Sequence, residues 1–297
     1  MGFRAVLGAI GFLVISASAS FPSCMNALFD RAPRRADDIA QLIQKAEEGD
    51  LTAQFRLGVA YESGVGAEKD YAKALRWYLR AANAGHSGAQ NNLGSMYGRG
   101  LGVDQNDVQA MKWYLRAASE GHPAAQYNAG FMYDSGQGVT RSEDSALYWY
   151  QKAAAQSYAP AESALAYMYA EGRGLKRDLK ESLKWYRAAA KTGYAGAEFS
   201  LGLAYFRGAG VARDAREAVK WFQKAAVHGS STAAGVLGLV YERGLGVSQD
   251  HATADKWKEA AGDAGVAQAL RMLSALEPIA SERTMNAAAT LPTLSTP

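Results

Sequence analysis

All six tryptophans of this 297-residue sequence fall in one column of a strict 36-residue repeat. They are Trp77, Trp113, Trp149, Trp185, Trp221 and Trp257. The same interval separates six tyrosines, from Tyr61 to Tyr241, and six glycine pairs, from Gly64 and Gly66 to Gly244 and Gly246. Self-similarity at a fixed period of this length is typical of a solenoid of stacked supersecondary units.

Each repeat is predicted to contain two helices. In the first, Ala53, Leu57 and Tyr61 lie on one face of a 3.6-residue period, and the glycine pair ends the helix. The second helix begins at a column of side chains that can accept first-turn amides: Asp70, Asn106, Ser142, Asp178, Asp214 and Asp250. It ends at a column that allows a left-handed residue: Gly85, Gly121, Ser157, Gly193, Gly229 and Gly265.

One helix pair cannot hide its apolar face, whereas neighbouring pairs bury that face on each other. We therefore predict an all-α fold, a right-handed α/α solenoid superhelix of six 36-residue helix-pair repeats with terminal capping helices. The six tryptophans are expected to form the structural core of the repeats. Burial of one large aromatic side chain stabilises a fold by about 1.5–3 kcal/mol, so this column should contribute much of the stability.

The same periodicity sets the domain boundaries. Residues 36–49 are predicted to form an N-terminal capping helix, since Ala46 and Gly49 precede Ala82 and Gly85 by one period. Residues 50–265 hold the six repeats. Residues 266–276 are predicted to form a C-terminal capping helix, because Leu273 follows Leu237 by one period. The small, polar residues 277–297 are predicted to be a disordered tail.

The N-terminus has the layout of a secretory signal peptide. Arg4 gives a positive start, residues 5–15 form an apolar run, and Ala17 and Ala19 make an A-x-A site. We predict a signal peptide at 1–19, a flexible leader at 20–35, and a periplasmic or secreted protein without an integral membrane span. A permanent anchor is the alternative, although the run is short for one. Cys24 could be lipidated, cross-linked or inert.

Composition argues against several function classes. A formal charge of +3 is far below that of a nucleic-acid binder, so no nucleic-acid partner is predicted. A single cysteine permits neither a disulfide framework nor a cysteine zinc site. No hydrolase, zinc-protease or nucleotide-binding motif is present, and two of the four histidines, His86 and His122, share an inter-repeat turn column. We predict no enzyme activity, no catalytic residues, no metal and no cofactor.

Segments such as 57–85, LGVAYESGVGAEKDYAKALRWYLRAANAG, resemble the Sel1-like repeat, a relative of the tetratricopeptide repeat. The resemblance covers Leu51 to Gly265. The departures from the pattern are Ala129, Ala166, Ser182, Lys258 and Gly262, of which the last two indicate a partly solvent-facing final repeat.

The resemblance implies an adaptor that assembles other proteins. Some bacterial members are periplasmic and hold a sensor kinase inactive or support exopolysaccharide export. We therefore expect a periplasmic adaptor or negative regulator that binds a membrane-protein ectodomain. The alternative is a secreted factor that binds host proteins, and a more distant alternative is a cell-wall hydrolase.

By resemblance to tetratricopeptide domains, first-helix positions outside the packing columns should line a concave groove. A monomer would bind a peptide or an amphipathic helix of another protein there. The candidate residues are Tyr127, Phe131, Tyr167, Phe199, Leu203, Phe206, Arg207, Leu239 and Arg243. Tyr127 and Phe199 are at a position that is often aromatic in the family, so a packing role is the alternative for them.

A second candidate surface is a basic edge just before the second-helix caps. It consists of Lys69, Arg141, Arg177 and Arg213. Such an edge could attract acidic polysaccharide or lipid headgroups. The alternative is that these are ordinary solvated loop charges.

Overall fold

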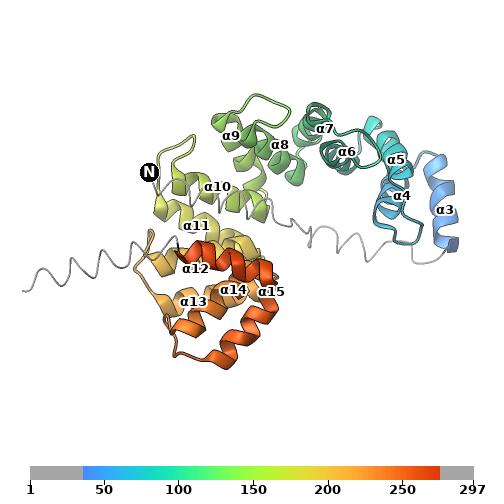
Figure 1. The fold of residues 1–297 in the computed structure, drawn as a ribbon. Coiled ribbons are helices and arrows are strands. Elements are labelled where there is room, and N and C mark those ends of the chain that lie inside the picture. Colours follow the sequence, from blue (N-terminus) through green and yellow to red (C-terminus); the bar gives the residue numbers. More distant parts are fainter. Residues whose placement is uncertain (1–35, 275–297) are drawn as a thin grey trace, which may run out of the picture. The chain divides into compact units, whose positions relative to one another are not determined.

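The computed structural model describes residues 36–274, and every regular element in that range is an α-helix (Figure 1). The helices are α3 (Ala36–Glu47), α4 (Leu51–Ser63), α5 (Tyr71–Asn83), α6 (Ser87–Arg99), α7 (Asp107–Ser119), α8 (Pro123–Ser135), α9 (Glu143–Ala154), α10 (Ala159–Glu171), α11 (Leu179–Ala190), α12 (Ala195–Arg207), α13 (Ala215–Val227), α14 (Ser231–Arg243) and α15 (His251–Ser274). None of these thirteen helices has the length and apolarity that crossing a membrane requires. The predicted signal peptide, leader and tail lie outside the described residues.

The signals that define each repeat act as predicted. First helices end at a left-handed glycine, as at Gly64 with φ 78°. Second helices begin at the predicted caps, where Asp70 accepts from the Lys73 N–H at 2.9 Å and Asp214 from the Glu217 N–H at 3.0 Å. The all-α class and the helix-pair repeat are therefore confirmed, while the handedness of the superhelix stays a prediction.

The chain divides into two compact units. The N-terminal unit is described from residue 36 to 178 and holds α3–α10, and the C-terminal unit is described from 179 to 274 and holds α11–α15. Within each unit, helices pack mainly on the helices next to them along the chain. This is the nearest-neighbour packing that a stack of repeats requires.

Several of the most deeply buried rings lie one residue after a tryptophan. Tyr78 is 0% exposed and Phe222 is 1% exposed. Each ring lies directly on a first helix at a glycine: a Cβ added to Gly58 would be 2.3 Å from the Tyr78 ring, and one added to Gly202 would be 2.5 Å from the Phe222 ring. Glycine is needed at this column because the ring occupies the space that any side chain would fill.

The tryptophans themselves are only partly buried, all six of them. Trp77, Trp113, Trp149, Trp221 and Trp257 pack against the edges of the hydrophobic clusters. On the other side, cations cover several of the rings, for example Lys224 over Trp221 at 4.3 Å. The predicted core role is thus shared, and in three repeats the residue after the tryptophan, Tyr78, Tyr150 or Phe222, supplies a fully buried ring.

The C-terminal end departs from the predicted register. The break in α15 falls at Gly262 (φ 64°, ψ 171°) and not at Gly265, which lies in the helical segment 263–274. A Cβ on Gly265 would be 2.7 Å from the Ser231 carbonyl oxygen, and one on Gly235 would be 2.5 Å from the Gly265 carbonyl oxygen. The two glycines therefore permit a close crossing of α14 by this segment, which begins before the predicted residue 266.

Candidate partner-binding surface

Three of the predicted contact residues are buried. Phe199 is 1% exposed, Leu203 6% and Leu239 3%. They belong to one hydrophobic cluster with Met272 and Leu273 from segment 263–274. The expectation that these three side chains face a groove is therefore corrected. The early break at Gly262, which the repeat register did not predict, explains how the last helical segment comes to share their core.

The remaining predicted residues of the C-terminal unit lie at its surface. Phe206 is partly buried against the same cluster, with the Arg213 guanidinium 5.9 Å from its ring centroid. Arg207 is partly buried, and its Nε and Nη2 atoms have no hydrogen-bond partner among the described residues. Burial lowers the pKa of Arg207. Arg243 is exposed.

In the N-terminal unit, Tyr127, Phe131 and Tyr167 are all partly exposed on the first helices α8 and α10. Tyr127 also packs on the buried Tyr150, with ring centroids 5.7 Å apart, so it combines a packing role with its exposed edge. Phe131 and Tyr167 occupy the same repeat position one period apart and therefore present their rings on the same side of consecutive first helices.

A chain of hydrogen-bonded side chains links α8 to α6, α5 and α4, and the sequence-based prediction missed it. Asn128 Nδ2 donates to Asn91 Oδ1 at 3.0 Å, and Asn91 Nδ2 donates to Asn92 Oδ1 at 3.3 Å. Asn92 Nδ2 donates to the Tyr78 hydroxyl at 3.0 Å, and that hydroxyl donates to Glu62 Oε2 at 2.7 Å. Burial, together with the nearby Glu62 carboxylate, raises the pKa of Tyr78.

Among the described residues, the contacts of Asn92 and Asn128 leave hydrogen-bonding capacity unused. A side-chain amide has two N–H donors and an oxygen with two lone pairs, so one contact on each side does not exhaust it. Asn92 and Asn128 are partly exposed. Consecutive first helices thus present amide groups that match the donors and acceptors of a peptide backbone.

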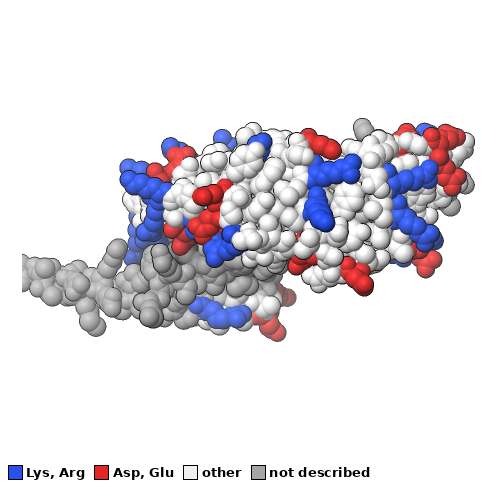
Figure 2. Space-filling view, turned by 90° about the horizontal axis from the view of Figure 1, so that it is seen from above, with Lys and Arg blue, Asp and Glu red and all other residues white. Residues whose placement is uncertain are grey.

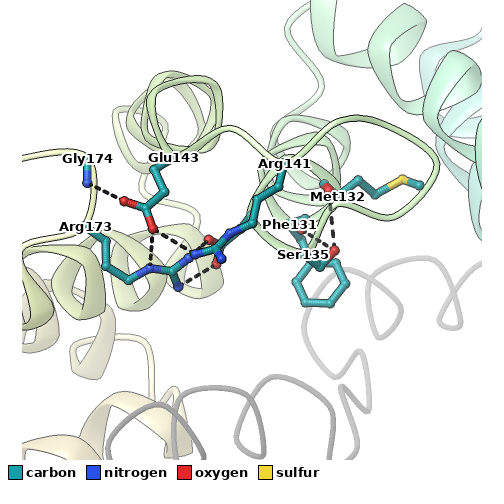
Figure 3. A network of polar contacts seen from close by, with 8 residues as sticks. Phe131, Met132, Ser135, Arg141, Glu143, Arg173 and Gly174 are labelled. Atoms are coloured by element: carbon teal, nitrogen blue, oxygen red, sulfur yellow. Dashed lines mark hydrogen bonds and ion pairs between the residues drawn. The ribbon is translucent and has the colours of Figure 1, made fainter. Parts of the chain in front are cut away.

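A charged network lies next to Phe131 (Figure 3). Arg173 donates to both carboxylate oxygens of Asp134, with Nη1 3.2 Å from Oδ2, and its Nε donates to Glu143 at 3.2 Å. Glu143 also accepts from the Gly174 N–H at 3.1 Å and from Arg141 at 2.8 Å. The network ties the segment after α10 to α8 and to the start of α9, and the Phe131 ring points away from it.

The electrostatics of this network follow from burial and pairing. Burial raises the pKa of Asp134, and the Arg173 guanidinium opposes that rise. Burial would also raise the pKa of Glu143, but hydrogen bonds and charge from Arg173, with Arg141 and the Gly174 N–H, hold it below its ordinary value. Arg173 was missed although its repeat position is aliphatic in four of the other five repeats, for example Val65 and Leu101, and is Gln137 in the fifth. The available signal was that Arg173 is the one charged residue at this position.

The predicted basic edge is largely occupied within the chain. The Lys69 ammonium lies 4.8 Å from the Tyr71 ring centroid, and Arg141 pairs with Glu143. Arg177 Nε donates to the Ala170 carbonyl at 2.8 Å. Arg213 lies over Phe206, as described above. These contacts favour the alternative that the four residues are ordinary loop charges, each in contact with a neighbouring group of the same chain.

No group of three or more His, Cys, Asp and Glu side chains in the part of the chain that the structure describes is arranged to hold a metal ion. The polar groups brought together on the first helices are amides, a hydroxyl and paired charges. Their geometry suits recognition of another chain.

Comparison with known proteins gives six matches to the Sel1 repeat, at residues 51–86, 87–122, 123–158, 159–194, 195–230 and 232–266. The chain is similar to the crystal structure of a protective antigen present in uropathogenic Escherichia coli strains, which displays an SLR fold. The identity is 36% and the TM-score 0.67, over 75% of this chain and 48% of that one. This chain thus spans about half the length of the E. coli structure.

A second similar structure is a Sel1 repeat protein from Oxalobacter formigenes, with 32% identity and a TM-score of 0.72 over 77% of this chain and 91% of that one. An immunity protein from Pseudomonas aeruginosa shares the fold at 22% identity, with a TM-score of 0.54 over 74% of this chain and 83% of that one. Among curated proteins, no sequence matches the chain.

Proposed function

Because this chain belongs to the Sel1 repeat family, whose members mediate protein–protein interactions, we propose that it is an exported, non-catalytic scaffold that binds another protein through first helices of its N-terminal unit. The family is generally non-catalytic. The proposed partner contributes an extended peptide segment.

The observation that carries this proposal is the pairing of amides with aromatic rings on consecutive first helices. We call it the amide–aromatic surface, and it consists of the partly exposed Asn92, Tyr127, Asn128, Phe131 and Tyr167, while the buried Asn91 links Asn92 to Asn128. Amides can bond the peptide backbone, while partly exposed rings provide anchors for its side chains. The paired charges of Asp134 and Arg173 hold the neighbouring loop in place.

For the cellular role, we propose a periplasmic adaptor or negative regulator that engages a membrane-protein ectodomain. The signal-peptide layout at residues 1–19 supports export. A secreted factor that binds host proteins is the second candidate. The similarity to a protein described as a protective antigen of uropathogenic E. coli favours that candidate. Fractionation separates the two, since the periplasmic adaptor stays in the envelope and the secreted factor accumulates in the medium.

The double substitution Phe131→Ala and Tyr167→Ala tests the binding surface. Envelope proteins captured by the wild-type chain are identified by mass spectrometry, and the affinity of the main partner is then measured with purified proteins. We expect the double variant to bind at least about tenfold more weakly, because truncation of central aromatic anchors is among the costliest changes at an interface. Circular dichroism confirms that both proteins remain helical.

The matched control is Val227→Ala with Leu270→Ala, which removes two large exposed apolar side chains from the C-terminal unit. It should bind like the wild type. Equal affinity of the Phe131/Tyr167 variant and the wild type would contradict the proposal.

A further inference from the structure

One repeat position of the second helices is basic in five of the six repeats, and the residues next to it differ between the two units. The column is Arg76, Lys112, Tyr148, Lys184, Lys220 and Lys256. In the C-terminal unit, Lys184 pairs with Glu181 at 2.6 Å and Lys220 with Glu217 at 2.9 Å, three residues earlier in each helix, whereas Lys256 has Thr253 at that position. In the N-terminal unit, the residues three positions earlier are Lys73, Gln109 and Ser145, and none of them is acidic.

In the N-terminal unit, the basic residues of this column and those one turn after them are therefore not neutralised within the described residues. Arg76, Arg80, Lys112, Arg116 and Lys152 are exposed, and the structure shows no ion pair for any of them within the described residues. The acidic residues of α5, α7 and α9 are confined to the first turns of α7 and α9. Figure 2 shows basic side chains gathered over α5 and over α7, with uncharged surface between the two groups.

Aromatic rings hold several of these cations in position. The Arg80 guanidinium lies 5.3 Å from the Trp77 ring centroid, and Arg116 lies 5.6 Å from Trp113. The Lys152 ammonium lies 4.8 Å from the Tyr148 ring. A cation already held over a ring loses less conformational freedom when it meets an anion, so the array is pre-organised for a negatively charged surface.

Two exposed apolar side chains accompany the cations. Val108 is 52% exposed on α7 and Tyr148 is 49% exposed on α9. Tyr148 also replaces the lysine or arginine that every other repeat has at this position. Side chains that combine an apolar body with a polar tip settle at the membrane–water interface, where nearby Lys and Arg meet lipid phosphates. A hydrated acidic polysaccharide would use the cations and would give these two side chains no apolar environment.

We propose that the outer face of α5, α7 and α9 docks on an anionic lipid bilayer, with Arg76, Arg80, Lys112, Arg116 and Lys152 on the headgroups and Tyr148 in the interface. We call this face the basic second-helix surface. It is distinct from the amide–aromatic surface, which first helices carry, so lipid docking and peptide binding can be tested separately.

The test is flotation of the full-length chain with vesicles of phosphatidylcholine alone or mixed with an equal amount of phosphatidylglycerol. Binding should require the anionic lipid and fall as salt is raised. Arg76→Gln with Lys112→Gln should weaken binding by roughly tenfold or more, since each basic residue near an anionic surface contributes about fivefold in affinity. Tyr148→Ala should also weaken binding, because it removes the interfacial ring.

The control is Lys184→Gln with Lys220→Gln, which removes the same charge from the same column where acidic partners already neutralise it. It should bind vesicles like the wild type. Both double variants keep residues 1–35, so any contribution of the apolar N-terminal run is the same in each. Three results would overturn the proposal: equal binding to neutral and anionic vesicles, equal losses in the two double variants, or retention on an acidic polysaccharide without binding to vesicles.

Discussion

The N-cap residues of the first helices occupy one repeat position but differ in the side-chain group that accepts the first-turn hydrogen bond. Asp50, His86, His122 and Ser230 accept the N–H three residues on, whereas Tyr158 and Tyr194 make no such side-chain bond. A histidine can cap in this way only while its Nδ1 is unprotonated, because the imidazolium ring has no acceptor. Two of the six first helices therefore begin with a cap that acid can remove.

The sign of the resulting pH dependence follows from burial. Burial lowers the pKa of His122, and the charge of His86 lowers it further. Burial also lowers the pKa of His86. The unfolded chain then binds more protons than the folded chain just below the unperturbed histidine pKa of about 6.5. The stability that the neutral caps contribute is complete above this value and is lost as pH falls below it.

His122→Asn should reduce this acid sensitivity, because asparagine accepts the Ala125 N–H at any pH. Urea unfolding midpoints measured at about pH 7.5 and about pH 5.5 should differ less in the variant than in the wild type. The effect should approach the value of one helix cap, about 1 kcal/mol. The reverse change, Ser230→His, should add sensitivity to acid. An unaltered difference between the two midpoints in His122→Asn would show that the cap does not titrate with folding.

One buried repeat position of the first helices holds glutamine in some repeats and glutamate in others. Gln54 and Gln126 each donate an amide N–H to the last turn of the preceding second helix, to the Ala46 and Ala118 carbonyls at 2.9 and 3.2 Å. Glu198 occupies the same column at 2% exposure and cannot donate when ionised. It lies 2.7 Å from His228 Nδ1, which supplies the polar contact that this carboxylate needs.

At the scale of the helix, the glycines inside first helices have two different physical roles. Gly94 lies under the Tyr114 ring, and a Cβ there would be 2.6 Å from the ring. Gly98, one turn later in α6, would place its Cβ 3.6 Å from Ala110, an ordinary contact. One glycine is required by packing, and the other only lowers helix propensity.

The paired substitutions Gly94→Ala and Gly98→Ala should therefore have opposite effects on stability. Gly94→Ala should lower the free energy of unfolding by about 1–3 kcal/mol, the usual cost of overpacking. Gly98→Ala should raise it by about 0.5–1 kcal/mol through helix propensity. Denaturant unfolding of both variants measures the difference. Similar changes in the two would mean that the ring does not rest on the backbone at Gly94.

Element boundaries were largely predictable because caps and left-handed glycines are local signals. The caps at Asp70, Asn106, Ser142, Asp214 and Asp250 all accept a hydrogen bond as expected. The position of the break in α15 was not predictable in this way. Gly262 and Gly265 are both glycines, and the close crossing of Gly235 and Gly265 accompanies a break at Gly262.

At the scale of the whole molecule, the 36-residue periodicity predicted the number of repeats and the all-α class, because each of the repeat positions described above recurs at the same interval. It did not reveal which aromatic ring is enclosed, because Trp77 and Tyr78 are adjacent and both apolar in character. Of the residues predicted for the candidate surface, Phe131 and Tyr167 are partly exposed, whereas Leu203 and Leu239 are buried in a cluster with residues of the segment after the break in α15. The asparagine chain and Arg173 depend on contacts between repeats, which no single repeat encodes.

The central claim, that first helices of the N-terminal unit bind a protein partner, is tested most directly by site-specific photo-crosslinking in living cells. A photoreactive phenylalanine analogue is placed at position 131, 167 or, as the control, at the exposed Glu259 of α15. We predict that the same partner is cross-linked from positions 131 and 167 and not from position 259. Adducts that are absent from 131 and 167, or that are the same at all three positions, would contradict the claim.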